Sequence, residues 1–198
     1  MTAQAREPAM RPGPVSPASA MQACGRPVDE SARLAAAQRA AATVCDPEIP
    51  SLTLEDLGVL RSVTLEGEAV VVTIVPTYTG CPATEAIRDD LRTALESAGI
   101  GAFLIRIALA PAWRSDWITE AGRAKLRAAG IAPPACGSAL AAPRVAGIRF
   151  IERATHAVAC PRCGSLDSEN VSEYGSTACK ALYRCLACAE PFDYFKPY

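Results

Sequence analysis

The chain has 198 residues, of which 50% are hydrophobic, and its formal net charge is −1. This length suits one domain of ordinary size plus a small module. The near-neutral charge does not favour a nucleic-acid or membrane-surface binder. No run of 18 apolar residues is present to form a transmembrane helix. The first residues lack the apolar segment of a secretory signal, so we expect a cytoplasmic protein.

Residues 1–27 are rich in Ala, Pro, Gly and Ser without periodicity, which predicts a disordered tail. An alanine-rich helix is expected over residues 29–44, with Asp29 or Ser31 as its N-cap. It ends before Pro47, because a residue that precedes proline resists the helical conformation. The following stretch, residues 46–50, holds two prolines and is expected to be an extended, rigid loop.

Two strands are expected at residues 57–65 and 69–75, joined by a turn at Glu66-Gly67. Apolar residues recur at helical spacing over residues 83–98 and predict a helix with one buried face. A third strand at 103–109 would complete a small βαβ-type sheet with packed helices. Further on we expect a polar and aromatic loop at 111–117, a short helix at 119–129, a linker at 136–152 and a strand at 148–153.

Cys81 stands where a strand gives way to a helix, in the sequence Thr79-Gly80-Cys81-Pro82. Pro82 suits the first helical position, where its missing N–H is not needed. The unpaired N–H groups at a helix N-terminus favour thiolate over thiol, which predicts a reactive or metal-binding sulfur at Cys81. The alternative is a cysteine that fills a small apolar space.

Asp46 and Glu48 project from the loop that precedes the sheet. If this loop covers the strand end next to Cys81, two carboxylates and one sulfur share a pocket. Such a set is too incomplete for a permanent metal site, but it suits transient binding of iron or an iron–sulfur cluster. The alternative, which residue chemistry alone favours, is that Asp46 caps local backbone and Glu48 is solvated. No Ser/His/Asp set, P-loop or dinucleotide-binding pattern is present, so we expect no independent enzyme.

Nine cysteines in a reducing compartment point to metal or thiol chemistry. Four of them form two C-x-x-C pairs, Cys160 with Cys163 and Cys185 with Cys188, and four thiolates at this spacing can converge on one tetrahedral ion. We therefore predict a zinc ribbon at residues 153–198, whose small core depends on structural zinc. Its strands are expected at 170–174 and 181–184.

Iron is the alternative occupant of a four-sulfur site and would make the module a rubredoxin-like electron carrier. We favour zinc, because Ala189 follows the second pair where a rubredoxin-like knuckle has glycine. Cys179 is a possible extra thiol, as a substitute ligand, a reactive group or, the favoured interpretation, a packed side chain. The single histidine, His156, is read as a surface residue in preference to a ligand. We assign no role to the cysteines that show no pattern, which are Cys24, Cys45 and Cys136.

Three motifs of the first module, at residues 46–50, 56–59 and 79–82, resemble the small α/β domain of iron–sulfur cluster assembly factors in order and spacing. The rest of the chain narrows the resemblance to the PaaD (PaaJ) family, the D subunits of bacterial phenylacetyl-CoA epoxidase, also called phenylacetate-CoA oxygenase. The residues that carry it are Trp113, Asp116 to Ile118, Gly130 to Pro134, the two C-x-x-C pairs, Gly175 to Tyr183 and Glu190 to Lys196. The domains expected from these observations are a tail (1–27), an assembly-type α/β domain (28–135), a linker (136–152) and the ribbon (153–198).

The resemblance implies a non-catalytic accessory subunit of a multicomponent monooxygenase in aerobic phenylacetate catabolism. Its implied partners are the di-iron oxygenase and the reductase of that system. By analogy with the assembly factors, the chain would help to install iron or a cluster in a partner, with Cys81 as the working thiol beside Asp46 and Glu48. Members of the family often carry a cysteine soon after the C-terminal Phe-Lys; this chain has Pro197 and Tyr198 instead, so that role is missing or falls to Cys179. A rubredoxin-like electron-transfer component and a purely structural subunit are the alternatives.

Overall fold

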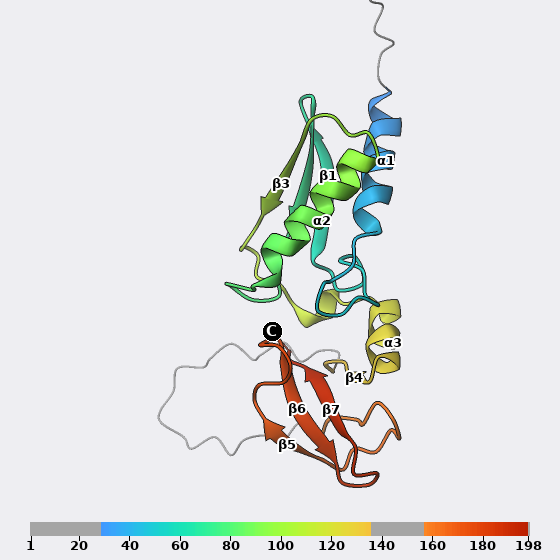
Figure 1. The fold of residues 1–198 in the computed structure, drawn as a ribbon, viewed down its shortest axis with the longest axis vertical. Coiled ribbons are helices and arrows are strands. Elements are labelled where there is room, and N and C mark those ends of the chain that lie inside the picture. Colours follow the sequence, from blue (N-terminus) through green and yellow to red (C-terminus); the bar gives the residue numbers. More distant parts are fainter. Residues whose placement is uncertain (1–28, 136–156, 198) are drawn as a thin grey trace, which may run out of the picture.

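The computed structural model describes residues 29–135 and 157–197. The expected tail, the linker and the strand at 148–153 lie outside the described residues, as do Cys24, Cys136 and His156. The described residues form an α/β module and a β-ribbon module, which follow one another along the long axis (Figure 1). In this part of the chain, no helix is both long and apolar enough to span a membrane.

The α/β module is a three-stranded sheet with a helix between its second and third strands. The strand order is β1-β2-β3, with β1 and β2 antiparallel and β2 and β3 parallel, which confirms the βαβ unit. Both long helices pack over the sheet and contact each other (Figure 1). The element bounds are α1 Glu30–Ala42, β1 Leu60–Glu66, β2 Ala69–Ile74, α2 Ala83–Ser97 and β3 Phe103–Ile107.

Both helices follow local sequence signals. The side chain of Asp29 accepts a hydrogen bond from the N–H of Ser31 (3.1 Å) and caps α1, as expected. The buried face of α2 holds the apolar residues that recur at helical spacing, namely Ala83, Ile87, Leu91 and Leu95.

The loop after α1 corrects one expectation, because it is a turn and not an extended segment. One carboxylate oxygen of Asp46 accepts hydrogen bonds from the N–H groups of Glu48 (2.8 Å) and Ile49 (2.9 Å). The N–H of Ile49 also bonds the carbonyl of Asp46 (3.2 Å). A short acidic side chain that satisfies two neighbouring donors bends the chain back on itself.

The segment after β3 packs against the residues that precede β1. It contains the 3-10 turn η1 (Ser115–Trp117) and the helix α3 (Glu120–Ala128). The indole N–H of Trp113 donates to the carbonyl of Leu57 (2.9 Å). Gly58 has φ +68°, and a Cβ there would lie 2.5 Å from the carbonyl oxygen of Trp117. Glycine is therefore required where the two segments meet.

The ribbon module has a sheet in the order β4-β7-β6-β5. Its first strand comes from the segment that follows α3 and pairs in parallel with β7, which the sequence did not predict. Two residues are too few to show a strand period, so no local pattern marks β4. The bounds are β4 Ile131–Ala132, β5 Ser168–Ser172, β6 Lys180–Cys185 and β7 Pro191–Phe195.

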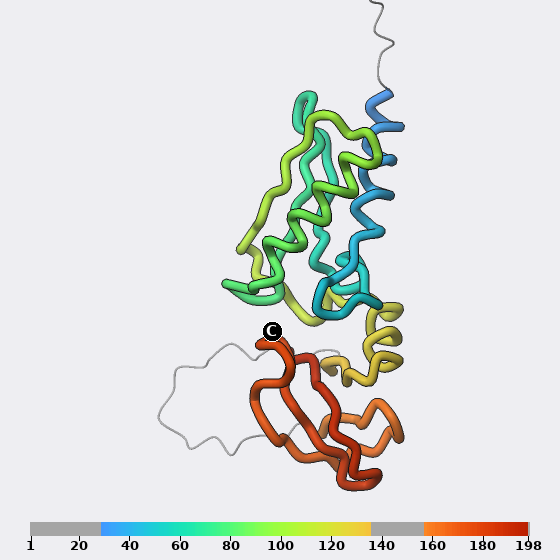
Figure 2. The backbone as a smooth tube through the Cα atoms, viewed as in Figure 1, coloured from blue at the N-terminus to red at the C-terminus, as the bar shows by residue number. Residues whose placement is uncertain are grey.

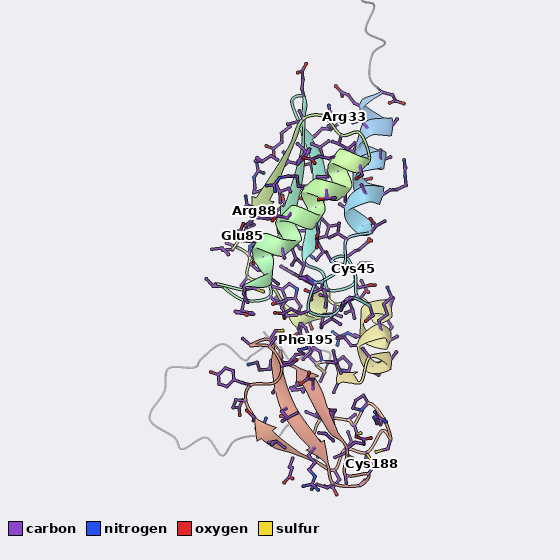
Figure 3. The ribbon with its side chains drawn as sticks, in the orientation of Figure 1. Arg33, Cys45, Glu85, Arg88, Cys188 and Phe195 are labelled. Atoms are coloured by element: carbon purple, nitrogen blue, oxygen red, sulfur yellow. The ribbon has the colours of Figure 1, made fainter. Side chains whose placement is uncertain are left out.

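The hydrophobic core of the α/β module extends into the ribbon, whose remaining buried residues form a separate cluster that includes Phe192. Phe195 is 1% exposed, and its ring centroid lies 5.9 Å from that of Trp113. Cys179 and Ile131 belong to the same core cluster. The tube in Figure 2 shows β7 running back to the α/β module, and Figure 3 shows Phe195 between the modules with Cys188 at the far end of the ribbon. This shared core fixes how the modules face each other.

Candidate functional site

The four cysteines of the C-x-x-C pairs converge at the far end of the ribbon. Their sulfurs all lie within 4.8 Å of one another. Cys160 and Cys188 are 3.8 Å apart at sulfur, and Cys163 and Cys185 are 3.6 Å apart. A tetrahedral ion with metal–sulfur bonds of about 2.3 Å has sulfur–sulfur edges of about 3.8 Å. The cluster therefore fits a four-coordinate metal ion, and its spacing is far too long for disulfides.

Backbone N–H groups favour deprotonated sulfur in each knuckle, but hydrogen bonding among the neighbouring thiols leaves the pKa of Cys163 and of Cys188 raised and that of Cys185 lowered. The N–H of Cys188 points at the sulfur of Cys185 (3.5 Å), and this contact lowers the pKa of Cys185 to about 7. Gly164 and Ala189 follow the two pairs with φ +75° and +61°. Ala189 thus adopts the left-handed conformation that glycine takes more readily, so the missing glycine does not break the turn.

Cys81 lies at the start of α2, where the sequence placed it. It is half-buried and packs against the core of the α/β module. Pro82 directly precedes the helix and already has helical dihedrals, φ −66° and ψ −24°. The N–H of Thr84 bonds the carbonyl of Cys81 (3.2 Å), so the turn and the helix are continuous.

The expectation of a stabilised thiolate at Cys81 is wrong. Burial raises the pKa of Cys81, and the negative charges of Glu48 and Asp46 raise it further. The backbone N–H of Ala83 and the hydroxyl of Tyr78 lower it only in part. Sequence reasoning counted the helix end and left out the two carboxylates, although it placed both of them near this sulfur.

Asp46 and Cys81 line one small cavity of about 10 Å³. Burial raises the pKa of Asp46, although its two backbone hydrogen bonds oppose that shift. Asp46 therefore caps local backbone, as the alternative interpretation held, and it also faces the cavity beside the sulfur. Glu48 is half-buried, so it is not the solvated side chain of that interpretation.

Cys179 enters the same region from the ribbon. It is 5% exposed, and its sulfur lies 3.6 Å from a carboxylate oxygen of Glu48 and 3.0 Å from the hydroxyl of Thr177. Burial, together with the charge of Glu48, raises the pKa of Cys179 to about 11. The side chain is packed, as expected, but its contact with Glu48 spans 131 positions, and no local signal could have shown it.

Tyr78 is a neighbour of both thiols that the sequence analysis missed. Its hydroxyl is hydrogen-bonded to Cys81. Burial raises the pKa of Tyr78 to about 12, and charge on Cys81, Cys179 and Glu48 acts in the same direction. The phenol, two thiols and two carboxylates thus form a junction cluster, which we define as Asp46, Glu48, Tyr78, Cys81 and Cys179.

Comparisons with known proteins agree with both modules. A profile of the iron–sulfur cluster assembly protein family matches residues 34–101, and one of the PaaD zinc beta ribbon domain matches residues 146–196. A Porphyromonas gingivalis Fe-S protein maturation auxiliary factor is 36% identical over 80 residues, which are 39% of this chain and 75% of that protein. The crystal structure of a domain of unknown function (DUF59) from Bacillus anthracis aligns with a TM-score of 0.45 and 21% identity, over 48% of this chain and 92% of that domain.

One relative matches most of the chain. The putative D subunit of the 1,2-phenylacetyl-CoA epoxidase of Escherichia coli (strain K12) is 48% identical over 151 residues. The match covers 76% of this chain and 85% of that protein. On this identity and coverage, the chain belongs to the PaaD family.

Proposed function

We propose that the chain is an accessory component of the phenylacetyl-CoA epoxidase system, and that it assists iron or iron–sulfur cluster assembly in partner subunits through Cys81. The family supports the accessory role, because the similar Escherichia coli protein bears the name of one subunit of that epoxidase. The assembly-type profile over residues 34–101 supports the delivery of iron. The di-iron oxygenase and the reductase of the system are the proposed recipients.

The observation that carries this proposal is the position of Cys81. Its sulfur is half-buried beside a cavity that it shares with Asp46, and it is hydrogen-bonded to Tyr78. Because burial and the two carboxylates raise the pKa of Cys81, the free thiol keeps its proton at neutral pH. Metal binding must displace that proton, and reprotonation promotes release. A site of this kind suits transfer better than permanent storage.

The ribbon has a separate role in this proposal. Cys160, Cys163, Cys185 and Cys188 would hold one zinc ion, which supplies folding energy to a module whose own core is small. The ribbon then acts as a docked structural element. Because Cys179 and Phe195 belong to the core of the α/β module, the docked ribbon also holds Cys179 against Glu48.

The test compares Cys81→Ser with Cys45→Ser. Cys45 is a matched control, because it is also a half-buried thiol but its sulfur contacts the carbonyl of Thr43 (3.7 Å) and lies outside the junction cluster. Each variant is co-expressed with the oxygenase and reductase subunits, and iron is measured in the purified partners. Cys81→Ser should lower partner iron while Cys45→Ser leaves it unchanged. Equal partner iron in both would refute the role of Cys81.

Electron transfer is the second candidate function, because four sulfurs at these distances suit iron as well as zinc. Metal analysis and a visible spectrum of the purified chain separate the two. Colourless protein with about one zinc per chain excludes the electron carrier. Red protein whose absorption is bleached by dithionite would instead place redox chemistry in the ribbon.

A further inference from the structure

We propose that Cys179 is the second thiol of the Cys81 site, so that one divalent metal ion is carried between the two modules by the sulfurs of Cys81 and Cys179 and the carboxylate of Glu48. This inference rests on the proposed function and specifies which metal species the chain carries. The ion would be mononuclear, with ferrous iron as the cargo that a di-iron partner needs, and not a preformed cluster.

Glu48 is the group that links the two thiols. Its carboxylate oxygen lies 3.6 Å from the sulfur of Cys179, and its charge also acts on Cys81. Tyr78, hydrogen-bonded to Cys81, is within electrostatic reach of Cys179 and of Glu48. Three segments distant in sequence, the loop after α1, the turn before α2 and the residue before β6, therefore bring metal-binding side chains to the same junction between the modules.

The position of Cys179 is built into the ribbon sheet. Its carbonyl accepts a hydrogen bond from the N–H of Lys196 (2.9 Å), and the next residue, Lys180, pairs with Phe195 across the sheet. Phe195 in turn packs against Trp113 of the α/β module. The contact between Phe195 and Trp113 thus lies on the strand next to Cys179, and it holds the thiol of Cys179 close to Glu48.

Lys180 offsets part of the negative charge at the site. It is buried, and its ammonium lies 3.5 Å from a carboxylate oxygen of Asp193. Its positive charge lowers the pKa of both Cys179 and Asp46, in opposition to the larger effect of burial. A single buried cation beside two thiols and two carboxylates leaves a net negative site once the thiols ionise, which favours a cation as the occupant.

Size and donor number favour one ion over a cluster. The cavity that Cys81 and Asp46 line, which does not include Glu48 or Cys179, is about 10 Å³, close to the smallest volume that holds one water molecule and too small for a cluster. An iron–sulfur cluster usually takes four cysteine ligands, whereas two thiols meet here. Two sulfurs with one or two carboxylate oxygens make a donor set of intermediate softness that suits Fe²⁺ or Zn²⁺.

Binding requires the side chains to close around the ion. Among residues 29–135 and 157–197, only the four ribbon cysteines form a group of three or more potential metal ligands whose donor atoms all lie within 4.8 Å of one another. Rotation of the side chains would bring the two sulfurs and the carboxylate onto the metal. Two metal–sulfur bonds form, the two thiol protons pass to solvent, and no electron is transferred. Reversal of these steps returns the ion to a partner and the protons to the thiols.

The test is a cobalt titration of the full-length, zinc-loaded protein without oxygen. Co²⁺ bound by thiolate gives a sulfur-to-metal charge-transfer absorption, and zinc content is followed in parallel. Wild-type protein should bind one Co²⁺ per chain without losing zinc. Cys81→Ser and Cys179→Ser should each weaken the affinity for Co²⁺ by at least about tenfold, because even a residue that only supports a metal ligand contributes that much. Each variant should also lose about half of the charge-transfer absorption. Cys45→Ser should match wild type.

The outcomes separate this inference from the proposed function. Loss of binding in Cys81→Ser with full affinity and absorption in Cys179→Ser would overturn the inference and leave the Cys81 function standing. Unchanged binding in both would overturn both. If Cys179→Ser fails to retain its zinc, Glu48→Gln decides the matter, because its carboxylate is the shared ligand: weaker binding supports the site and unchanged affinity overturns it.

Discussion

Truncation of Phe195 tests whether the two modules share one core. Its side chain is 1% exposed and packs against the ring of Trp113. Phe195→Ala removes a buried ring and leaves a cavity, which costs roughly 3–5 kcal/mol in a well-packed core. Small domains are stable by only about 5–15 kcal/mol, so this change should shift the unfolding midpoint strongly.

Phe192→Ala is the matched control, because Phe192 lies in the same strand but faces the ribbon's own core beside Tyr183. Urea unfolding is followed by tryptophan fluorescence, since both tryptophans, Trp113 and Trp117, belong to the α/β module. Phe195→Ala should move the native emission to longer wavelength as water reaches Trp113, and it should speed the reaction of Cys179 with a thiol reagent. Phe192→Ala should leave the native emission unchanged.

The reasoning is refuted if Phe195→Ala costs less than about 1 kcal/mol, the range of an exposed site. It is equally refuted if the wild-type protein unfolds in two separate transitions with the tryptophan signal confined to one. Either result would mean that the ring contact does not couple the modules. The position of Cys179 beside Glu48 would then need another explanation.

Three further outcomes follow from the same geometry. Gly58→Ala should destabilise the fold by about 2–4 kcal/mol in urea unfolding, because its φ is positive and the new methyl group meets the carbonyl of Trp117. Gly67→Ala is the control: Gly67 has φ +60° but open space around it, so the change should cost only about 1–2 kcal/mol. Equal costs for the two variants would contradict the contact with Trp117. Removal of zinc by a chelator should abolish the ribbon strands in circular dichroism while α1 and α2 persist, and a ribbon unchanged without metal would contradict its dependence on zinc. Burial raises the pKa of Cys179 from 9.0 to about 11, so the stability that its neutral thiol contributes is complete below pH 9 and is lost as the pH rises to 11. The free energy of unfolding should therefore fall between pH 9 and pH 11, by no more than about 3 kcal/mol. Cys179→Ala should show a smaller fall over the same window.

The sequence predicted those elements whose signals are local. The cap at Asp29, the apolar spacing along α2 and the paired cysteines each lie within a few residues of the structure they specify. Of the ribbon strands, β5 and β6 were predicted to within two residues, whereas β4 and β7 were missed. Pro191 at the start of β7 reads as a loop signal. The prediction for the loop at Asp46 was wrong. Its prolines suggested an extended segment, but the carboxylate of Asp46 accepts hydrogen bonds from two N–H groups and the loop forms a turn.

The sequence analysis predicted that Asp46, Glu48 and Cys81 share a pocket, but it could not place Cys179 beside them, because the contact of Cys179 with Glu48 is distant in sequence. The turn at Cys81 showed a thiol at a helix end, and nothing near it indicated a partner about a hundred positions later. The pKa shift of Cys81 was predicted in the wrong direction because it, too, depends on packing between distant segments. A helix terminus is a local effect that sequence reveals, whereas burial, the largest cause of the raised pKa, depends on how the loop and the ribbon pack.

The four ribbon cysteines and the junction cluster lie at opposite ends of strand β6. β6 begins at Lys180, directly after Cys179, and ends at Cys185, a proposed metal ligand. Figure 3 places Cys188 at the end of the ribbon far from Phe195, so a metal ion held by the ribbon cysteines would lie far from the modules' contact. In the proposed arrangement that metal supplies order, since its binding energy would fold the strand that presents Cys179. A chain that loses ribbon zinc should therefore lose the second thiol of the transfer site while Cys81 stays in place.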